Sequence, residues 1–132
     1  RCSDPSYFAA GNVVHPVETA GVSMRDGRRV GRLVARDLAG HLPPAERRIP
    51  VAWPEPVTYA HPQVIALPDP DAVSRLDARV RRRTRACISL RVNDRAVWRR
   101  RRTFLPERRI TIPLRRVPAD THSVRIEVDE VS

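Results

Sequence analysis

Residues 7–20 hold the residue types that are best placed to bind a polar cofactor. A short apolar run, Tyr7 to Ala10, is predicted to be a strand; Gly11 ends it, and the polar residue Asn12 follows. A loop then leads to a helix that begins near Ala20. A strand that ends in glycine and a polar side chain, followed by a helix N-terminus, is how many α/β folds hold such a cofactor at the end of a sheet.

The helix that positions this loop is predicted over Val22 to Ala39, because apolar residues recur there at roughly helical spacing. Gly40 is a plausible C-cap, and the following prolines stop any continuation. Gly27 and Gly31 lie inside the helix, where each costs up to ~1 kcal/mol relative to alanine. They either allow a neighbouring strand or helix to approach closely or are simply tolerated.

A second type of pattern begins after the proline-containing linker His41 to Arg48. The domain boundary is placed between a first domain, residues 1–42, and a second, residues 43–132. Short alternating segments without a helical period predict an antiparallel β-sandwich, with Asn93–Asp94 as a hairpin turn and Pro113 in an edge strand. The expected strands are Ile49–Trp53, Val57–Tyr59, Gln63–Leu67, Ser74–Val80, Ala86–Val92, Ala96–Phe104, Arg109–Leu114 and Ser123–Val128.

The composition narrows the class of protein. The net charge is +10, yet all 25 basic residues are arginine and none is lysine. Since lysine also binds phosphate well, this bias favours a GC-rich codon preference over nucleic-acid binding. No apolar run reaches the length of a membrane span. Cys2 and Cys87 have no metal or dithiol spacing, the dispersed histidines give no metal site, and we expect a cytoplasmic, reducing compartment.

Four consecutive arginines, Arg99 to Arg102, follow Trp98 in one predicted strand. Side chains alternate between the faces of a strand, so two of these arginines would point toward any buried face. An edge strand, a bulge or an acidic partner surface would each relieve that conflict. The run is therefore either a solvated edge or an interaction site.

The first forty residues resemble the last sequence motif of the FAD-dependent pyridine nucleotide–disulfide oxidoreductase superfamily. In the family this motif reads Thr-Ser-x-Pro-x-Ile-Phe-Ala-x-Gly-Asp. The stretch after it is similar to the continuation in a bacterial subgroup, in which a β-rich tail can follow the flavin domain. The matching residues here are Cys2-Ser3-Asp4-Pro5-Ser6-Tyr7-Phe8-Ala9-Ala10-Gly11-Asn12, then His15-Pro16-Val17-Glu18-Thr19-Ala20-Gly21 and Gly27-Arg28-Arg29-Val30-Gly31.

The resemblance implies roles for individual residues. Gly11 would let the backbone approach the cofactor, and Asn12 stands where the family has an aspartate that binds the ribityl or pyrophosphate part of FAD. An amide both donates and accepts, so a hydroxyl or a phosphate oxygen remains a feasible partner. His15 and Glu18 either face the isoalloxazine or are loop residues with local partners.

The helix N-terminus also has a role under this resemblance. Thr19 would cap the helix, and the N-terminus near Ala20 would point at the flavin ring. Unpaired N–H groups and the helix dipole there favour the negative charge of a reduced flavin.

The resemblance therefore predicts an α+β chain: the terminal strand–helix piece of a Rossmann-like FAD-binding domain, followed by the β-sandwich. It implies an oxidoreductase in which FAD exchanges electrons with a nicotinamide, NAD(P), or another donor. No Gly-x-Gly-x-x-Gly unit occurs, so the remainder of the FAD domain would lie elsewhere in the protein or on a partner subunit. The isolated chain would then be inactive, and no catalytic residue is assigned.

A different class of function remains open beside the enzyme. On this reading the β-sandwich is a non-catalytic interaction module, and its arginine-rich face binds an acidic protein or nucleic acid. The substrate of the enzyme is not indicated by the sequence.

Overall fold

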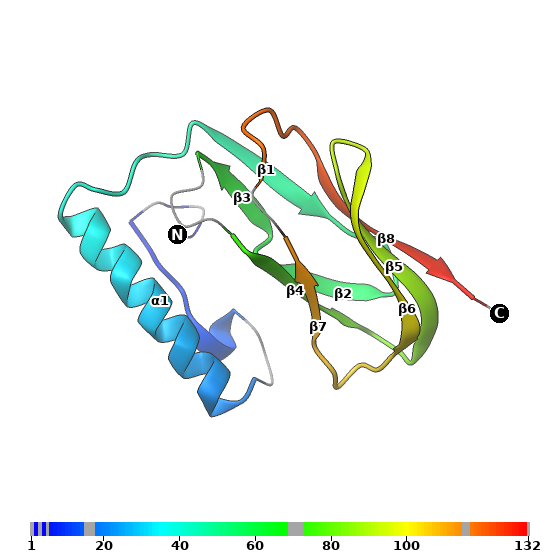
Figure 1. Ribbon diagram of the computed structural model, residues 1–132. Coiled ribbons are helices and arrows are strands. Elements are labelled where there is room, and N and C mark those ends of the chain that lie inside the picture. Colours follow the sequence, from blue (N-terminus) through cyan, green and yellow to red (C-terminus); the bar gives the residue numbers. More distant parts are fainter. Residues whose placement is uncertain are drawn as a thin grey trace. The chain divides into compact units, whose positions relative to one another are not determined.

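The alternating segments form strands, and the helical segment forms one long helix, α1 (Figure 1). The computed structural model describes residues 2, 4, 6–14, 18–68, 73–114 and 117–131, and within them it is mixed α+β with two sheets. The elements are the 3-10 helix η1 (Gly11–Val13), α1 (Ala20–Leu38), β1 (Arg47–Ala52), β2 (Val57–His61), β3 (Val64–Leu67), β4 (Arg75–Val80), β5 (Thr84–Val92), β6 (Arg95–Phe104), β7 (Ile110–Pro113) and β8 (Val124–Glu130).

The chain divides into two compact units, Arg1–Pro44 and Ala45–Ser132. The division falls inside the proline-containing linker, two residues after the boundary that the composition indicates. The first unit contains η1 and α1, and the second contains all eight strands.

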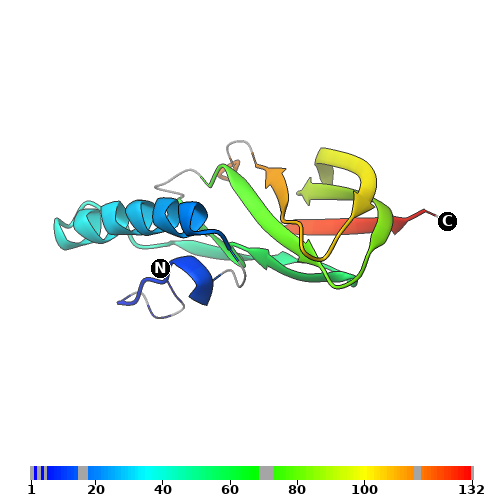
Figure 2. The same cartoon turned by 90° about the horizontal axis from the view of Figure 1, so that it is seen from below.

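The predicted helix is confirmed, and Gly40 forms its C-terminal cap as expected. Gly40 has φ +70°, a left-handed conformation that glycine adopts without a steric penalty. The N–H of His41 donates to the C=O of Arg36 at 2.8 Å, and the N–H of Gly40 donates to the C=O of Asp37 at 2.9 Å. These two bonds form a Schellman motif. Figure 2 shows α1 continuing unbroken to this end.

The predicted strand over Tyr7 to Ala10 is wrong. These residues carry no strand pairing, and Tyr7 is exposed. A strand needs a neighbour to accept its backbone hydrogen bonds, and no described segment provides one. The apolar run is followed by the single 3-10 turn of η1. The terminal piece of a Rossmann-like sheet that the pattern indicates is therefore not formed by these residues.

The second unit contains a five-stranded sheet in the order β3-β1-β8-β5-β6 and a three-stranded sheet in the order β2-β4-β7. The expected antiparallel pairing holds for every described strand pair except one. β1 and β8 pair in parallel, with Val51 opposite Val124 and Ala52 opposite Arg125. The first and last strands of the unit thus lie side by side, a contact between distant segments that local alternation does not reveal. Pro113 does end an edge strand, β7.

One apolar cluster joins the two sheets and forms the core of this unit. Alternate residues of β4 and β5 point into it, among them Leu76, Ala78, Ile88 and Leu90, all at most 1% exposed. Burial of apolar area of this kind is the main favourable term in folding. The other face of β4 carries Arg75, Asp77 and Arg79, which period-2 alternation places away from this cluster.

A two-residue turn joins β5 to β6. Asn93 and Asp94 have φ values of 48° and 63°, which is the pattern of a type I′ turn. The side chain of Asn93 also holds the chain before β8: its Oδ1 accepts from the N–H of His122 at 2.8 Å, and its Nδ2 donates to the C=O of Asp120 at 3.3 Å. The predicted hairpin is confirmed, and its first turn residue has a second structural role.

Replacing Asn93 with alanine is expected to destabilise the chain by about 2 kcal/mol, because it removes the side-chain bonds and places a less tolerant residue at positive φ. Urea unfolding followed by far-UV circular dichroism measures this loss. Asp94→Asn keeps a residue that accepts positive φ and serves as the control, with an expected change below about 1 kcal/mol. Equal losses in the two variants would contradict this role for Asn93.

Candidate functional site

The loop before α1 holds Gly11 and Asn12 at its start. Gly11 has φ +73°, and a Cβ placed on it would lie 3.7 Å from the Cβ of Ser23 in the first turn of the helix. Its conformation rather than crowding therefore favours glycine. Asn12 is exposed, and its Oδ1 accepts a hydrogen bond of 3.0 Å from the N–H of Glu18. This bond closes the loop across six residues.

The other predicted contacts lie at the beginning of the helix. Thr19 occupies the N-cap position, as expected, but its side chain makes no capping hydrogen bond. Its carbonyl accepts from the N–H groups of Val22 and Ser23 at 3.0 and 3.1 Å. Ala20 is exposed and Glu18 is half-buried. His15 lies outside the described residues.

The helix tip therefore presents backbone donors in an open position. The described hydrogen bonds of the first turn begin at Val22, so the N–H groups of Ala20 and Gly21 have no partner among the described residues. The hydroxyl of Ser23 is buried beside Gly11 and also has no described partner. Buried polar groups are nearly always paired, so this hydroxyl stands out among the described residues of the first unit.

The described residues of the first unit form almost no core. Val22 is the one buried residue of α1, while Met24 and Leu38 are 53% and 84% exposed. Nothing lies within 4 Å of a Cβ built on Gly27 or Gly31. The sequence suggested either that these glycines allow close approach of a neighbouring element or that they are simply tolerated. Among the described residues no element approaches either glycine closely.

The arginine run lies on β6, the edge strand of the larger sheet, and both the edge and the bulge considered from the sequence are present. β6 pairs only with β5, and the register shifts between Leu90 and Arg91. Every residue of β6 is exposed except Trp98, which is half-buried, and Phe104, which is buried. The arginines avoid burial because the strand lies at the rim of the sheet.

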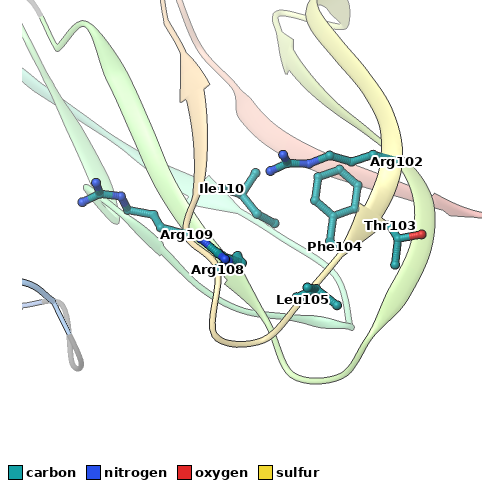
Figure 3. Close-up of a pocket in the computed structure, with 7 residues that line it drawn as sticks. All are labelled: Arg102, Thr103, Phe104, Leu105, Arg108, Arg109 and Ile110. Atoms are coloured by element: carbon teal, nitrogen blue, oxygen red, sulfur yellow. The ribbon is translucent and has the colours of Figure 1, made fainter.

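A pocket of about 400 Å³ lies where β6 ends and the chain turns into β7 (Figure 3). Phe104 and Ile110, both 1% exposed, contribute its apolar lining, and Arg102, Arg108 and Arg109 contribute its charge. The guanidinium of Arg102 lies 4.9 Å from the centre of the Phe104 ring, within the range of a cation–π contact.

Arg79 of β4 fixes the loop that lines this pocket. Its Nη1 donates to the C=O of Glu107 at 2.9 Å and to that of Pro106 at 3.4 Å, and its Nε donates to the hydroxyl of Tyr59 at 3.1 Å. One guanidinium thus ties the loop to two strands of the smaller sheet. Its planar array of donors suits this arrangement, and a lysine would lack it.

Asp77 is a buried carboxylate on the outer face of the same strand. Only 4% of it is exposed, and it accepts from the hydroxyl of Thr111 at 3.1 Å. Arg75 lies 3.2 Å and Arg109 3.8 Å from its two oxygens. Buried charges persist when they are paired in this way, and the pairing explains why Arg109 points away from Phe104 in Figure 3. The buried carboxylate of Asp77 therefore serves to hold β4, Thr111 and Arg109 together.

The described residues show neither a metal site nor a membrane-spanning helix. No three metal-binding side chains come together among them, and no helix there is long and apolar enough to cross a membrane. Cys2 and Cys87 are free thiols. Comparison with protein families, curated proteins and solved structures finds no match to the chain.

Sequence patterns found the loop and the arginine run but missed Ser23, Arg79 and the pocket. The pocket is lined by residues 102–105 and 108–110 alone, but its shape depends on how the chain turns between β6 and β7, which periodicity does not indicate. The alternation of Asp77 and Arg79 with apolar residues in one predicted strand could have indicated a polar outer face there.

Arg79→Ala is expected to lower stability by about 1–3 kcal/mol, because it leaves two loop carbonyls and the Tyr59 hydroxyl without this donor. The measurement is urea unfolding, together with hydrogen exchange of the loop amides from Leu105 to Arg109. Arg83→Ala removes an exposed arginine and should change stability by less than about 0.5 kcal/mol. Unchanged stability and loop protection in Arg79→Ala would refute this role.

Proposed function

We propose that the first unit completes the flavin site of a FAD-dependent oxidoreductase and that the β-rich unit is an accessory domain of the same enzyme. The observation that carries this proposal is the tip of α1, where a glycine at positive φ lies beside two N–H groups and a hydroxyl that have no partner among the described residues. The resemblance of residues 2–21 to the last motif of the flavoprotein superfamily names the cofactor.

The poor burial of the first unit supports the same proposal. A helix of 19 residues with one buried side chain is marginal by itself in water. The exposed surface at Gly27 and Gly31 would let another element of a FAD-binding domain approach the helix backbone closely. The proposal thus gives both glycines a reason that the described residues do not provide.

Each residue at the tip has a distinct part in the proposed site. Gly11 brings the backbone close to the cofactor, and the N–H groups of Ala20 and Gly21 face the pyrimidine end of the flavin. The helix dipole there favours the anionic reduced flavin, which raises its tendency to accept electrons. The flavin supplies the redox chemistry itself.

Asn12 holds the loop in place through its bond to the Glu18 amide. Its Oδ1 is engaged in that bond, so its Nδ2 is the group that would donate to a ribityl hydroxyl or a phosphate oxygen. The proposal assigns Glu18 and Thr19 to the loop that orients the tip. A nicotinamide, NAD(P), is the proposed electron donor, bound by other parts of the enzyme.

The test compares the 132-residue chain with the product of the complete open reading frame that encodes it. We expect the complete product to hold one FAD per chain and this chain alone to hold none, measured by absorbance near 450 nm after gel filtration. Stoichiometric FAD on the isolated chain, or a flavin-free complete product, would overturn the proposal.

Gly11→Val in the complete product is expected to weaken FAD binding at least tenfold, because valine cannot adopt φ +73° without strain. Gly40→Val imposes the same strain at the other end of α1 and is the matched control. Titration of the apoprotein with FAD, followed by flavin fluorescence, measures both. Equal losses in the two variants would mean that Gly11 acts on folding alone.

A further inference from the structure

We propose that the outer edge of β6 binds an extended acidic segment of a partner protein by strand addition, with Arg99 to Arg102 pairing with its carboxylates. The proposal concerns the β-rich unit and does not depend on the flavin site. It combines two observations made on the described residues: a backbone edge without a neighbouring strand, and four arginines along that edge without a carboxylate partner.

The backbone of β6 has one partner. β5 pairs with it over its whole length, from Thr84 opposite Phe104 to Val92 opposite Arg95. Among the described residues no strand and no backbone hydrogen bond lies on its other side. In a paired strand alternate N–H and C=O groups point away from the partner, so a ten-residue strand offers several of them to an incoming peptide.

The register of β5 and β6 places the arginines on both sides of this edge. Arg100 and Arg102 lie opposite Ile88 and Ala86, whose side chains are in the core. They therefore project from the core-facing side, beyond the rim of the apolar cluster. An extended segment bound along the edge would have guanidinium groups above and below it.

The two remaining arginines of the run project from the opposite face. Arg99 and Arg101 lie opposite Ser89 and Cys87, which β8 pairs with Glu127 and Asp129. Glu127 and Asp129 belong to β8, which lies two strands away from β6, so the backbones are about 10 Å apart at ordinary strand spacing. In the described structure no carboxylate forms an ion pair with either arginine.

A second copy of this chain is a poor occupant of the edge. Two β6 strands pairing with each other would place the two arginine runs against one another, and like charges directly opposite destabilise a sheet. The same charges protect the edge from aggregation. Only a segment with carboxylates at successive positions would satisfy both the edge and the charge.

A nucleic acid fits the edge less well. Proteins that bind single strands without sequence preference combine basic grooves with exposed aromatic rings on which bases stack. The aromatic residues of β6 are Trp98 and Phe104; the first packs against the core and the second is buried in it. The N–H and C=O groups along the open edge of β6 also have the spacing of the backbone groups of an extended peptide, not that of a nucleic acid.

The experiment uses the full chain and a fluorescent peptide, Thr-Val-Glu-Glu-Glu-Glu-Val-Thr, whose four glutamates match the four arginines. We expect saturable binding in 50 mM NaCl that weakens in 300 mM NaCl. The same peptide N-methylated at its four glutamates keeps the charge but loses those backbone donors, and we expect it to bind at least tenfold more weakly. Equal binding of the two peptides would overturn strand addition.

The protein variants separate this edge from general charge. Arg99→Ser with Arg101→Ser should weaken peptide binding at least tenfold and leaves the contact of Arg102 with Phe104 intact. Arg28→Ser with Arg32→Ser removes two exposed arginines of α1 and should change binding less than twofold. Equal effects in the two double variants, no peptide binding at 1 mM, or tighter binding of a ten-residue oligothymidylate than of the peptide would each refute the proposal.

Discussion

Successive side chains of a strand point to opposite faces of its sheet, and this constraint decides where β6 can lie. Its core-facing positions include Trp98 and Phe104, which belong to or pack against the apolar cluster, and also Arg100 and Arg102, which must reach water. Burying an unpaired guanidinium would cost several kcal/mol. A strand that satisfies both demands has to occupy the rim of the sheet, where one side is paired and the other is open.

The same alternation explains the rest of the β-rich unit. β4 and β5 are central strands because their core-facing positions are apolar apart from the buried Thr84 at the start of β5. On the other face of β4 the buried carboxylate of Asp77 is paired with Arg75 and Arg109. Arg75 of β4 thus has a carboxylate partner, whereas among the described residues no carboxylate pairs with Arg99 to Arg102 of β6. The proposal that β6 binds an acidic segment rests on this difference.

The helical unit differs from the β-rich unit because its local structure is well formed while nearly all side chains of its helix are at least partly exposed. The C-terminus of α1 is capped and the loop before it is closed by the hydrogen bond between Asn12 and Glu18, but Val22 alone is buried in α1. Good local structure without a core is what a segment shows when its stabilising contacts belong to another element. The exposed glycine surface and the open helix tip are the two places where such contacts would form, and the flavin proposal accounts for both.

The sequence predicted all eight strands, the turn at Asn93 and the helix, because each depends on periodicity or on a residue that tolerates positive φ. It did not predict the parallel pairing of β1 with β8, which depends on how the chain returns after β7. It was wrong about Tyr7 to Ala10, because an apolar run forms a strand only beside a partner. For the candidate site the glycine and the cap position were visible, whereas the unpaired Ser23 hydroxyl was not.

The central claim is that the β-rich unit holds its own core while α1 depends on contacts from outside it. Amide hydrogen exchange on the purified 132-residue chain tests this most directly, since protection reports the free energy of local opening. The account predicts that amides of α1 between Met24 and Val34 exchange at least a hundredfold faster, relative to their unstructured rates, than those of Ile88 and Leu90 in β5. Equal protection of the helix and of β5 would contradict it.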